Sequence, residues 1–190
     1  LNRWIKKTQG SLVVLIIDHK IRVNSTNEAK YVKNILANLN IESSIIRVNK
    51  NYISKNTMNE ARKNRFMQLI NYCKKNKILH LFLGHHFNDN LETYFLRKLA
   101  GSNFEGLRSI QDKKFTNNVQ ILRPLLIFKK NDILNYNYKN NISFVEDPSN
   151  QNVQYSRVVV RNFLYNNAKY SIKLHKNFEN IKKNYPFYKK

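Results

Sequence analysis

The run "SLVVLIID", Ser11–Asp18, decides the fold of this chain. It is a continuous stretch of β-prone apolar residues, which predicts a strand buried on both faces, as in parallel sheets. The next segment, Ser25–Leu39, repeats apolar residues at helical spacing, and Ser25 with Glu28 predicts a capping box at its start. A second strand is predicted over Ser43–Val48, which completes a strand–helix–strand unit.

The alternation of strands and helices continues along the chain. Thr57 and Glu60 predict another capping box, at the start of a helix that buries Cys73, and Ile78–Gly84 is predicted to be the third strand. This order predicts an α/β fold with a doubly wound parallel sheet. Ligands of such sheets bind at the carboxyl ends of the strands, so the loops there are candidate sites. These loops are Asp18–Arg22, Val48–Met58 and Gly84–Asn90.

The alternation weakens beyond about Asp112, and the C-terminal part is predicted to be a helical extension of the sheet domain. Within it, "RPLL", Arg123–Leu126, predicts a short extended piece. A helix is predicted from about Asn131 to Lys139, and "FVEDPSN", Phe144–Asn150, predicts a turn.

The composition points to a polyanionic partner. The 190 residues carry a formal net charge of +22, and nucleic acid is the first candidate for such a basic surface. The alternative is A/T-rich codon usage, which would enrich lysine without a function. The single cysteine, Cys73, excludes an internal disulfide framework and any site built from several cysteines, and its helical spacing predicts a core position. No run is long enough for a membrane span, and no signal peptide is visible.

The densest polar stretch is "GHHFNDNLET", Gly84–Thr93, which follows the third predicted strand. On a helical wheel, a group of five polar side chains forms around Asp89, with the other four within about sixty degrees of it. They are His85, His86, Asp89, Glu92 and Thr93. A helix N-terminus at a strand end suits phosphate, a carboxylate there could hold magnesium or position an amine, and an imidazole could act as acid or base. The alternative is an ordinary solvated polar face.

This stretch also carries a family resemblance. "GHHFNDNLET" resembles the Gly-His-His-x-Asp-Asp-x-x-Glu-Thr signature of the tRNA(Ile)-lysidine synthetases, which belong to the N-type ATP pyrophosphatases, the PP-loop superfamily. Other stretches of the chain, over roughly Leu12 to Arg161, resemble further motifs of this family in the expected order. They are "IIDHKIR" (16–22), "NEARKNRF" (59–66), "RKLAGSNFEGL" (97–107), "LRPLL" (122–126), "FVEDPSN" (144–150) and "YSRVVVR" (155–161).

Three departures from the family pattern stand out. Asn88 takes the place of the usual first aspartate, so a metal role would depend on Asp89, and Val158 takes the place of an asparagine. The Ser-Gly-Gly-x-Asp-Ser loop that holds ATP in this family is not in the sequence. "LNRWIKK", Leu1–Lys7, looks like the end of the helix that follows that loop. We therefore expect the chain to start just after the loop, to lack the first strand, and to bind ATP poorly by itself.

The resemblance implies a Rossmann-like fold of the adenine nucleotide α-hydrolase type. Residues 1–112 would be a partial N-type ATP pyrophosphatase domain without the PP-loop, and residues 113–190 the rest of the catalytic domain with a basic, tRNA-contacting helical extension. The implied reaction converts the wobble cytidine of tRNA(Ile), which has a CAU anticodon, to lysidine. It uses ATP, magnesium and free L-lysine, and it releases AMP and pyrophosphate.

The resemblance and the residue types together assign candidate roles. The catalytic candidates are His86, Asp89, Glu92 and Arg62, with Asp89 also the candidate metal ligand. The candidates for binding substrate or nucleotide are Asp18, His19, Arg65, His85 and Thr93. The candidates for binding tRNA are Arg157, Arg161, Lys169 and Lys173. Their alternatives are ordinary ones: a strand-end cap for Asp18, an ion pair with Glu60 for the arginines of the second helix, and codon bias for the lysines.

Other functions stay open at this point. The chain could be a non-catalytic or split tRNA-binding remnant of the family. It could also be a tRNA thiolase of the same superfamily, although the cytidine thiolases need paired cysteines, which this chain lacks. A homodimer is left open. The expected compartment is a bacterial cytoplasm, or an organellar matrix if the gene is organellar, and no membrane partner is expected.

Overall fold

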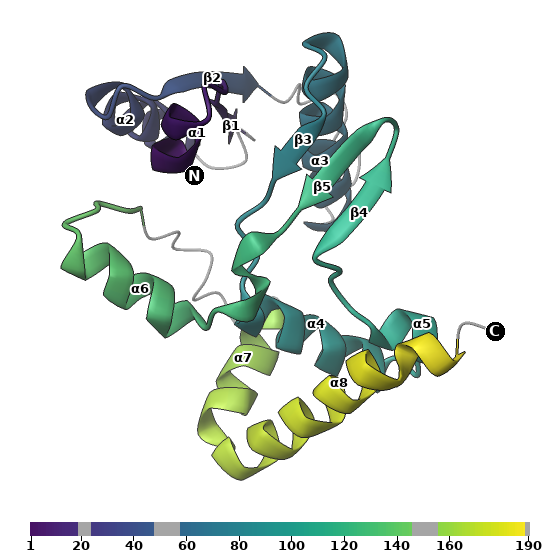
Figure 1. Ribbon diagram of the computed structural model, residues 1–190. Coiled ribbons are helices and arrows are strands. Elements are labelled where there is room, and N and C mark those ends of the chain that lie inside the picture. The colour runs from purple at the N-terminus through teal and green to yellow at the C-terminus, as the bar shows by residue number, and fades with distance from the viewer. Residues whose placement is uncertain (19–23, 48–57, 146–155, 189–190) are drawn as a thin grey trace. The chain divides into compact units, whose positions relative to one another are not determined.

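The computed structural model describes residues 1–18, 24–47, 58–145 and 156–188 (Figure 1). The chain divides into two compact units. Unit 1 contains Leu1–Leu81, Asn117–Val119 and Ser143–Val145, and unit 2 contains Phe82–Thr116, Gln120–Ile142 and Glu146–Lys190. Each unit is described by itself below.

Unit 1 contains the strand–helix–strand unit that the sequence predicts. Its elements are α1 (Asn2–Lys7), β1 (Val13–Asp18), α2 (Ser25–Asn38), β2 (Glu42–Arg47) and α3 (Met58–Lys75). β1 and β2 pair in parallel, with Ile16 opposite Ile45, so the parallel sheet is confirmed. The parallel pairing requires a crossover, which α2 supplies. The predicted core position of Cys73 is also confirmed, because its side chain is 1% exposed.

The first turn of α2 differs from the prediction. Asn24 takes the N-cap position without a side-chain hydrogen bond to the helix, and Ser25 is the first helical residue, so the predicted capping box of Ser25 and Glu28 is wrong. The Ser25 hydroxyl instead donates to Asp18 Oδ1 at 3.0 Å, and the Thr26 hydroxyl donates to Asp18 Oδ2 at 2.8 Å. Asp18 is 1% exposed, and a buried carboxylate requires such donors. The other predicted capping box includes Thr57, which lies outside the described residues.

A three-stranded sheet contains β3 (His80–Phe82), β4 (Lys113–Thr116) and β5 (Val119–Leu122), in the order β3-β5-β4. The third predicted strand therefore exists, is shorter than expected, and pairs with β5. The sequence analysis did not predict β4 and β5. Asn117 and Asn118 connect them with φ angles of 49° and 62°, which is the left-handed geometry of a two-residue hairpin turn.

Unit 2 contains most of the helices (Figure 1). They are α4 (Phe87–Leu99), α5 (Phe104–Leu107), the 3-10 helix η2 (Pro124–Ile127), α6 (Lys130–Lys139), α7 (Ser156–Asn166) and α8 (Ala168–Tyr188). The prediction of α6 and of the helical C-terminal part is confirmed. The predicted extended piece at Arg123–Leu126 is wrong, because Pro124 starts a 3-10 helix there, and proline suits a first helical position. Most of the predicted turn "FVEDPSN", from residue 146 on, lies outside the described residues.

The core of unit 2 lies where α4, α7 and α8 pack against one another (Figure 1). Its buried members are Leu91, Tyr94, Phe95, Val160, Leu164, Leu174 and Phe178. The rings of Tyr94 and Phe178 lie 4.9 Å apart, and Phe178 is 0% exposed. Each fully buried side chain of this size contributes about 1.5–3 kcal/mol, so this cluster fixes α4 against two neighbours. No helix in the described part of the chain is both long and apolar enough to span a membrane.

Candidate functional site

The candidate site is built around the start of α4. His86 has extended backbone and caps the helix: its Nδ1 accepts from the Asp89 N–H at 3.4 Å. The Asp89 carboxylate in turn accepts from the His86 N–H at 3.0 Å. The helix therefore starts at Phe87, and the prediction that His85 and His86 share a helical face with Asp89 is wrong. Since Nδ1 of His86 accepts, the neutral imidazole carries its proton on Nε2.

Three polar residues of α4 are enclosed by protein. Asn90 is 0% exposed, Glu92 is 2% exposed and Thr93 is 8% exposed. The alternative interpretation as a solvated polar face is therefore wrong for Glu92 and Thr93. Buried polar groups need partners, and the structure supplies one for each of them from a distant segment.

Glu92 is paired with Arg161 of α7. The Arg161 Nε donates to Glu92 Oε1 at 2.8 Å, and Nη2 donates to Oε2 at 3.4 Å. The hydrogen bond to Glu92 raises the pKa of the Arg161 guanidinium, with added support from the charges of Glu92 and Asp89, while burial opposes the rise. A two-pronged bond of this kind fixes both partners in orientation as well as in distance.

Thr93 is held from two sides. Its hydroxyl donates to the Asp89 carbonyl oxygen at 2.7 Å and accepts from Arg157 Nη2 at 2.9 Å. Arg157 and Arg161 lie four residues apart on α7, and both contact α4. Their predicted contact with tRNA stays a prediction. Each guanidinium already donates at least one hydrogen bond to α4.

Asn90 is a site-building residue that the sequence analysis missed. Its Oδ1 accepts from the Ile110 N–H at 2.8 Å, and its Nδ2 donates to the Ile110 carbonyl oxygen at 3.1 Å. The segment after α5 is thereby joined to the first turn of α4. Arg123 was also missed: it is 9% exposed, and its Nη1 donates to the Gln111 carbonyl oxygen at 2.8 Å. Burial lowers the pKa of Arg123, and the nearby Asp112 partly offsets this effect.

The remaining candidates lie elsewhere. Asp18 ends β1, and Arg62 and Arg65 are exposed on α3, so these three belong to unit 1. Lys169 and Lys173 are exposed on α8 in unit 2, and His85 is half-buried just before α4. His19 lies outside the described residues. The structure thus gathers His86, Asp89, Glu92, Thr93, Arg157 and Arg161 at one place.

Asp89 is the candidate ligand for magnesium at this site. Within the described ranges there is no group of three or more His, Cys, Asp or Glu side chains that could enclose a metal ion. Magnesium is commonly held by one or two carboxylates together with substrate phosphates, and Asp89, with a side chain 20% exposed, fits that smaller role. Asn88 is committed to another contact, because its Oδ1 accepts from the Lys130 N–H at 2.9 Å.

The family model of the PP-loop domain, an ATP-binding domain, matches residues 1–168. The chain belongs to the PP-loop domain family. The helix with His86 and Asp89 is therefore α4 of a PP-loop domain. The predicted Rossmann-like α/β fold with added helices is confirmed.

Curated relatives of this PP-loop domain are lysidine synthases. The chain is 40% identical over 164 residues to the tRNA(Ile)-lysidine synthase of Orientia tsutsugamushi, covering 86% of this chain and 37% of the relative. It is 36% identical over 166 residues to that of Wolbachia pipientis wMel, covering 86% of this chain and 38% of the relative. The chain thus spans less than two-fifths of the length of these relatives.

A solved structure supports the fold of this PP-loop domain. The U34-tRNA thiolase NcsA from Methanococcus maripaludis, with its [4Fe-4S] cluster, is similar with a TM-score of 0.76 and 15% identity. The similarity covers 95% of this chain and 64% of the thiolase. At this identity the likeness concerns the fold alone. A thiolase function is not favoured, since the curated relatives are lysidine synthases and the single cysteine is buried.

Proposed function

We propose that this PP-loop domain takes part in the ATP-dependent conversion of the wobble cytidine of tRNA(Ile) to lysidine. The observation that carries the proposal is the similarity to lysidine synthases over 86% of the chain, including all of α4 with His86, Asp89 and Glu92. ATP would activate the carbon-2 oxygen of the cytidine and release pyrophosphate. The ε-amine of free lysine would then attack carbon-2 and displace AMP.

The start of α4 suits the phosphate chemistry of the first step. A helix N-terminus favours anions, and the Nε2–H of His86 would donate to a phosphate oxygen there. Asp89 would contribute a carboxylate to magnesium, which lowers the cost of charge on the departing pyrophosphate. Its Oδ2 already accepts from the His86 N–H, so the capping bond would hold the carboxylate in one orientation.

Glu92 is our candidate for the lysine amine. Its carboxylate is 3% exposed and bound to Arg161, so an ammonium group at Glu92 would share the carboxylate with that guanidinium. The nearby positive charge of Arg161 would favour loss of a proton from the ammonium, and only the neutral amine can attack. His86 is the proposed proton acceptor in that step. It would act in its other neutral tautomer, in which Nδ1, 3.6 Å from Asp89 Oδ2, carries the proton and Nε2 is free to accept the proton from the ammonium.

The remaining parts of the proposal concern partners. tRNA with a CAU anticodon and free L-lysine are the proposed substrates, and the net charge of +22 supports a polyanionic one. Arg157, Arg161, Lys169 and Lys173 stay candidate tRNA contacts. A homodimer and the compartment, a bacterial cytoplasm or an organellar matrix, stay predictions.

The experiment compares Asp89→Asn with Asp132→Asn in the polypeptide that carries these residues. Asp132 makes the same capping bond at the start of α6, where its Oδ2 accepts from the Lys129 N–H at 3.0 Å. Both variants weaken a cap, but only the first removes a candidate magnesium ligand. Mass spectrometry of tRNA nucleosides measures lysidine formed from ATP and isotope-labelled lysine.

We expect the Asp89 variant to lose about 100-fold or more in lysidine formation, as loss of a stabilising charge in a transition state does. The Asp132 variant should stay within about twofold, because a surface cap affects stability by about 1 kcal/mol. Full activity of the Asp89 variant would refute the role of Asp89. No lysidine from the unmodified protein, with tRNA bound and no ATP consumed, would instead indicate a non-catalytic tRNA-binding protein.

A further inference from the structure

Four lysines line the outer side of α8. They are Lys169, Lys173, Lys176 and Lys183, and all four are exposed. At about 100° per residue, they fall within a sector of about 80° of the helix. Leu174 and Phe178, which are 1% and 0% exposed, lie on the opposite side in the core of unit 2. The four residues are called the α8 lysine stripe below.

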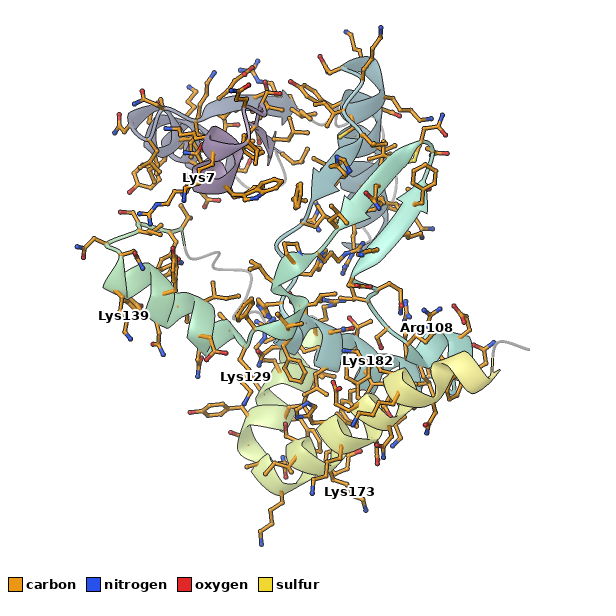
Figure 2. The ribbon with its side chains drawn as sticks, in the orientation of Figure 1. Lys7, Arg108, Lys129, Lys139, Lys173 and Lys182 are labelled. Carbon is orange, nitrogen blue, oxygen red and sulfur yellow. The ribbon has the colours of Figure 1, made fainter. Side chains whose placement is uncertain are left out.

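The stripe differs from Lys182, the fifth lysine of this helix. Lys182 Nζ lies 4.5 Å from the centre of the Phe178 ring and 3.7 Å from Glu179 Oε1. Figure 2 shows Lys173 on the side of α8 away from α4 and Lys182 on the side that faces α4. Glu179 is the only acidic residue in α8. None of the stripe lysines forms an ion pair with a carboxylate in the described part of the chain.

We propose that the α8 lysine stripe binds the phosphodiester backbone of RNA, which under the proposed function is the tRNA substrate. From Lys169 to Lys183 the stripe is about 21 Å long, at about 1.5 Å per residue. A stripe of this length spans several successive phosphates of one RNA strand, so more than one of its lysines can contact the same backbone. Lysine ammonium groups are flexible point charges, which suit phosphates of any sequence.

The geometry favours RNA over a membrane surface. A helix that binds a membrane inserts an apolar face into it. The buried apolar face of α8 is already used, since Leu174 and Phe178 pack against α4 and α7, and this leaves Ile172, which is 59% exposed, beside the stripe. The exposed sector between the lysines contains Asn180 instead, which can donate to phosphate.

The test measures binding of unmodified tRNA as a function of salt concentration. The variant Lys173→Gln/Lys176→Gln is compared with Lys182→Gln and the unmodified protein, after circular dichroism has established equal helix content. Each lost phosphate contact lowers the slope of log K against log salt by about 0.7–0.9. At about 0.1 M salt this amounts to about 5- to 8-fold per lysine.

We therefore expect the double variant to bind tRNA about 25- to 60-fold more weakly, with a slope reduced by about 1.4–1.8. Lys182→Gln should bind within about twofold of the unmodified protein, although it also loses one charge. Equal affinity and slope for all three proteins would overturn the proposal. Loss of binding to vesicles of anionic lipid in the double variant, with unchanged tRNA binding, would also overturn it.

The test separates this inference from the proposed function. If the unmodified protein forms lysidine and the double variant raises KM for tRNA while kcat stays constant, both are supported. If tRNA binding depends on the stripe but no lysidine forms, the stripe stands and the proposed function fails. If lysidine forms with unchanged KM in the double variant, the stripe fails and the proposed function stands.

Discussion

Replacing Arg161 with methionine tests whether the buried carboxylate of α4 depends on α7. The change would leave Glu92, with a side chain 3% exposed, without the guanidinium that now lies 2.8 Å away. Breaking a fully buried ion pair costs about 3–5 kcal/mol. The Arg161 side chain is 34% exposed, so solvent screens part of the interaction. We therefore expect a loss of about 2–3 kcal/mol in the free energy of unfolding.

The assay is urea denaturation followed by helical circular dichroism, to which α4, α7 and α8 of unit 2 contribute. In thermal denaturation, the same loss should lower Tm by about 4–12 °C for a chain of this size. The only tryptophan, Trp4, lies in unit 1, so its fluorescence gives a separate record from the same samples. If the denaturation curve shifts in circular dichroism but not in Trp4 fluorescence, the loss of stability lies in unit 2.

Arg108→Met is the matched control. Arg108 Nη1 lies 2.9 Å from Glu105 Oε1, nearly the distance of the Arg161 pair, but the Glu105 side chain is 65% exposed. We expect this exposed pair to contribute less than about 0.5 kcal/mol. Adding Glu92→Met to Arg161→Met should restore stability, because an apolar pair can replace a buried ion pair. Equal losses for Arg161→Met and Arg108→Met would refute the reasoning that burial of Glu92 makes its pair important.

Three further changes have expected outcomes. Asn90→Ala should cost about 2–3 kcal/mol in urea denaturation, because both polar groups of the Ile110 backbone lose their partner; a loss under about 0.5 kcal/mol would contradict this. Burial raises the pKa of the Cys73 thiol, so labelling by a thiol reagent should be slow in the folded protein and should keep rising with pH beyond the range where labelling of an exposed thiol levels off; rapid labelling near neutral pH would show an open core. Asn88→Asp keeps the acceptor for the Lys130 N–H and should change the free energy of unfolding by less than about 0.5 kcal/mol. The second carboxylate beside Asp89 should lower the magnesium concentration needed for lysidine formation. An unchanged magnesium requirement would count against magnesium at this helix.

The sequence predicts the parts of the fold that depend on local pattern. β1 and α2 have clear apolar periods, so their positions and the parallel pairing with β2 follow from the sequence. The β4–β5 hairpin was missed because its strands are only four residues each. The available signal was Asn117-Asn118 between two β-prone runs, since asparagine tolerates the positive φ of a hairpin turn.

The capping predictions show a different limit. A serine followed three residues later by a glutamate fits a capping box, but Ser25 donates to Asp18, which lies seven residues earlier. The opposite happens at α4, where the N-cap is a histidine, a residue that the usual sequence rule for N-caps does not include. In both cases the choice depends on which polar group needs a partner after packing, and the local pattern does not contain that information.

The same reasoning explains why a helical wheel could find the polar residues of α4 but not their state. A wheel treats polar side chains as exposed, and that holds when one side of a helix faces water. α4 instead packs against α7 and α8, so its polar residues bond to Ile110, 20 residues away, and to Arg157 and Arg161, 64 and 69 residues away. Such partners cannot be assigned from spacing. These contacts also mean that two helices, α4 and α7, together form the candidate site. A ligand that reaches Glu92 must compete with the Arg161 guanidinium of α7 or bind beside it. Substitutions in α7 should therefore alter the chemistry of α4.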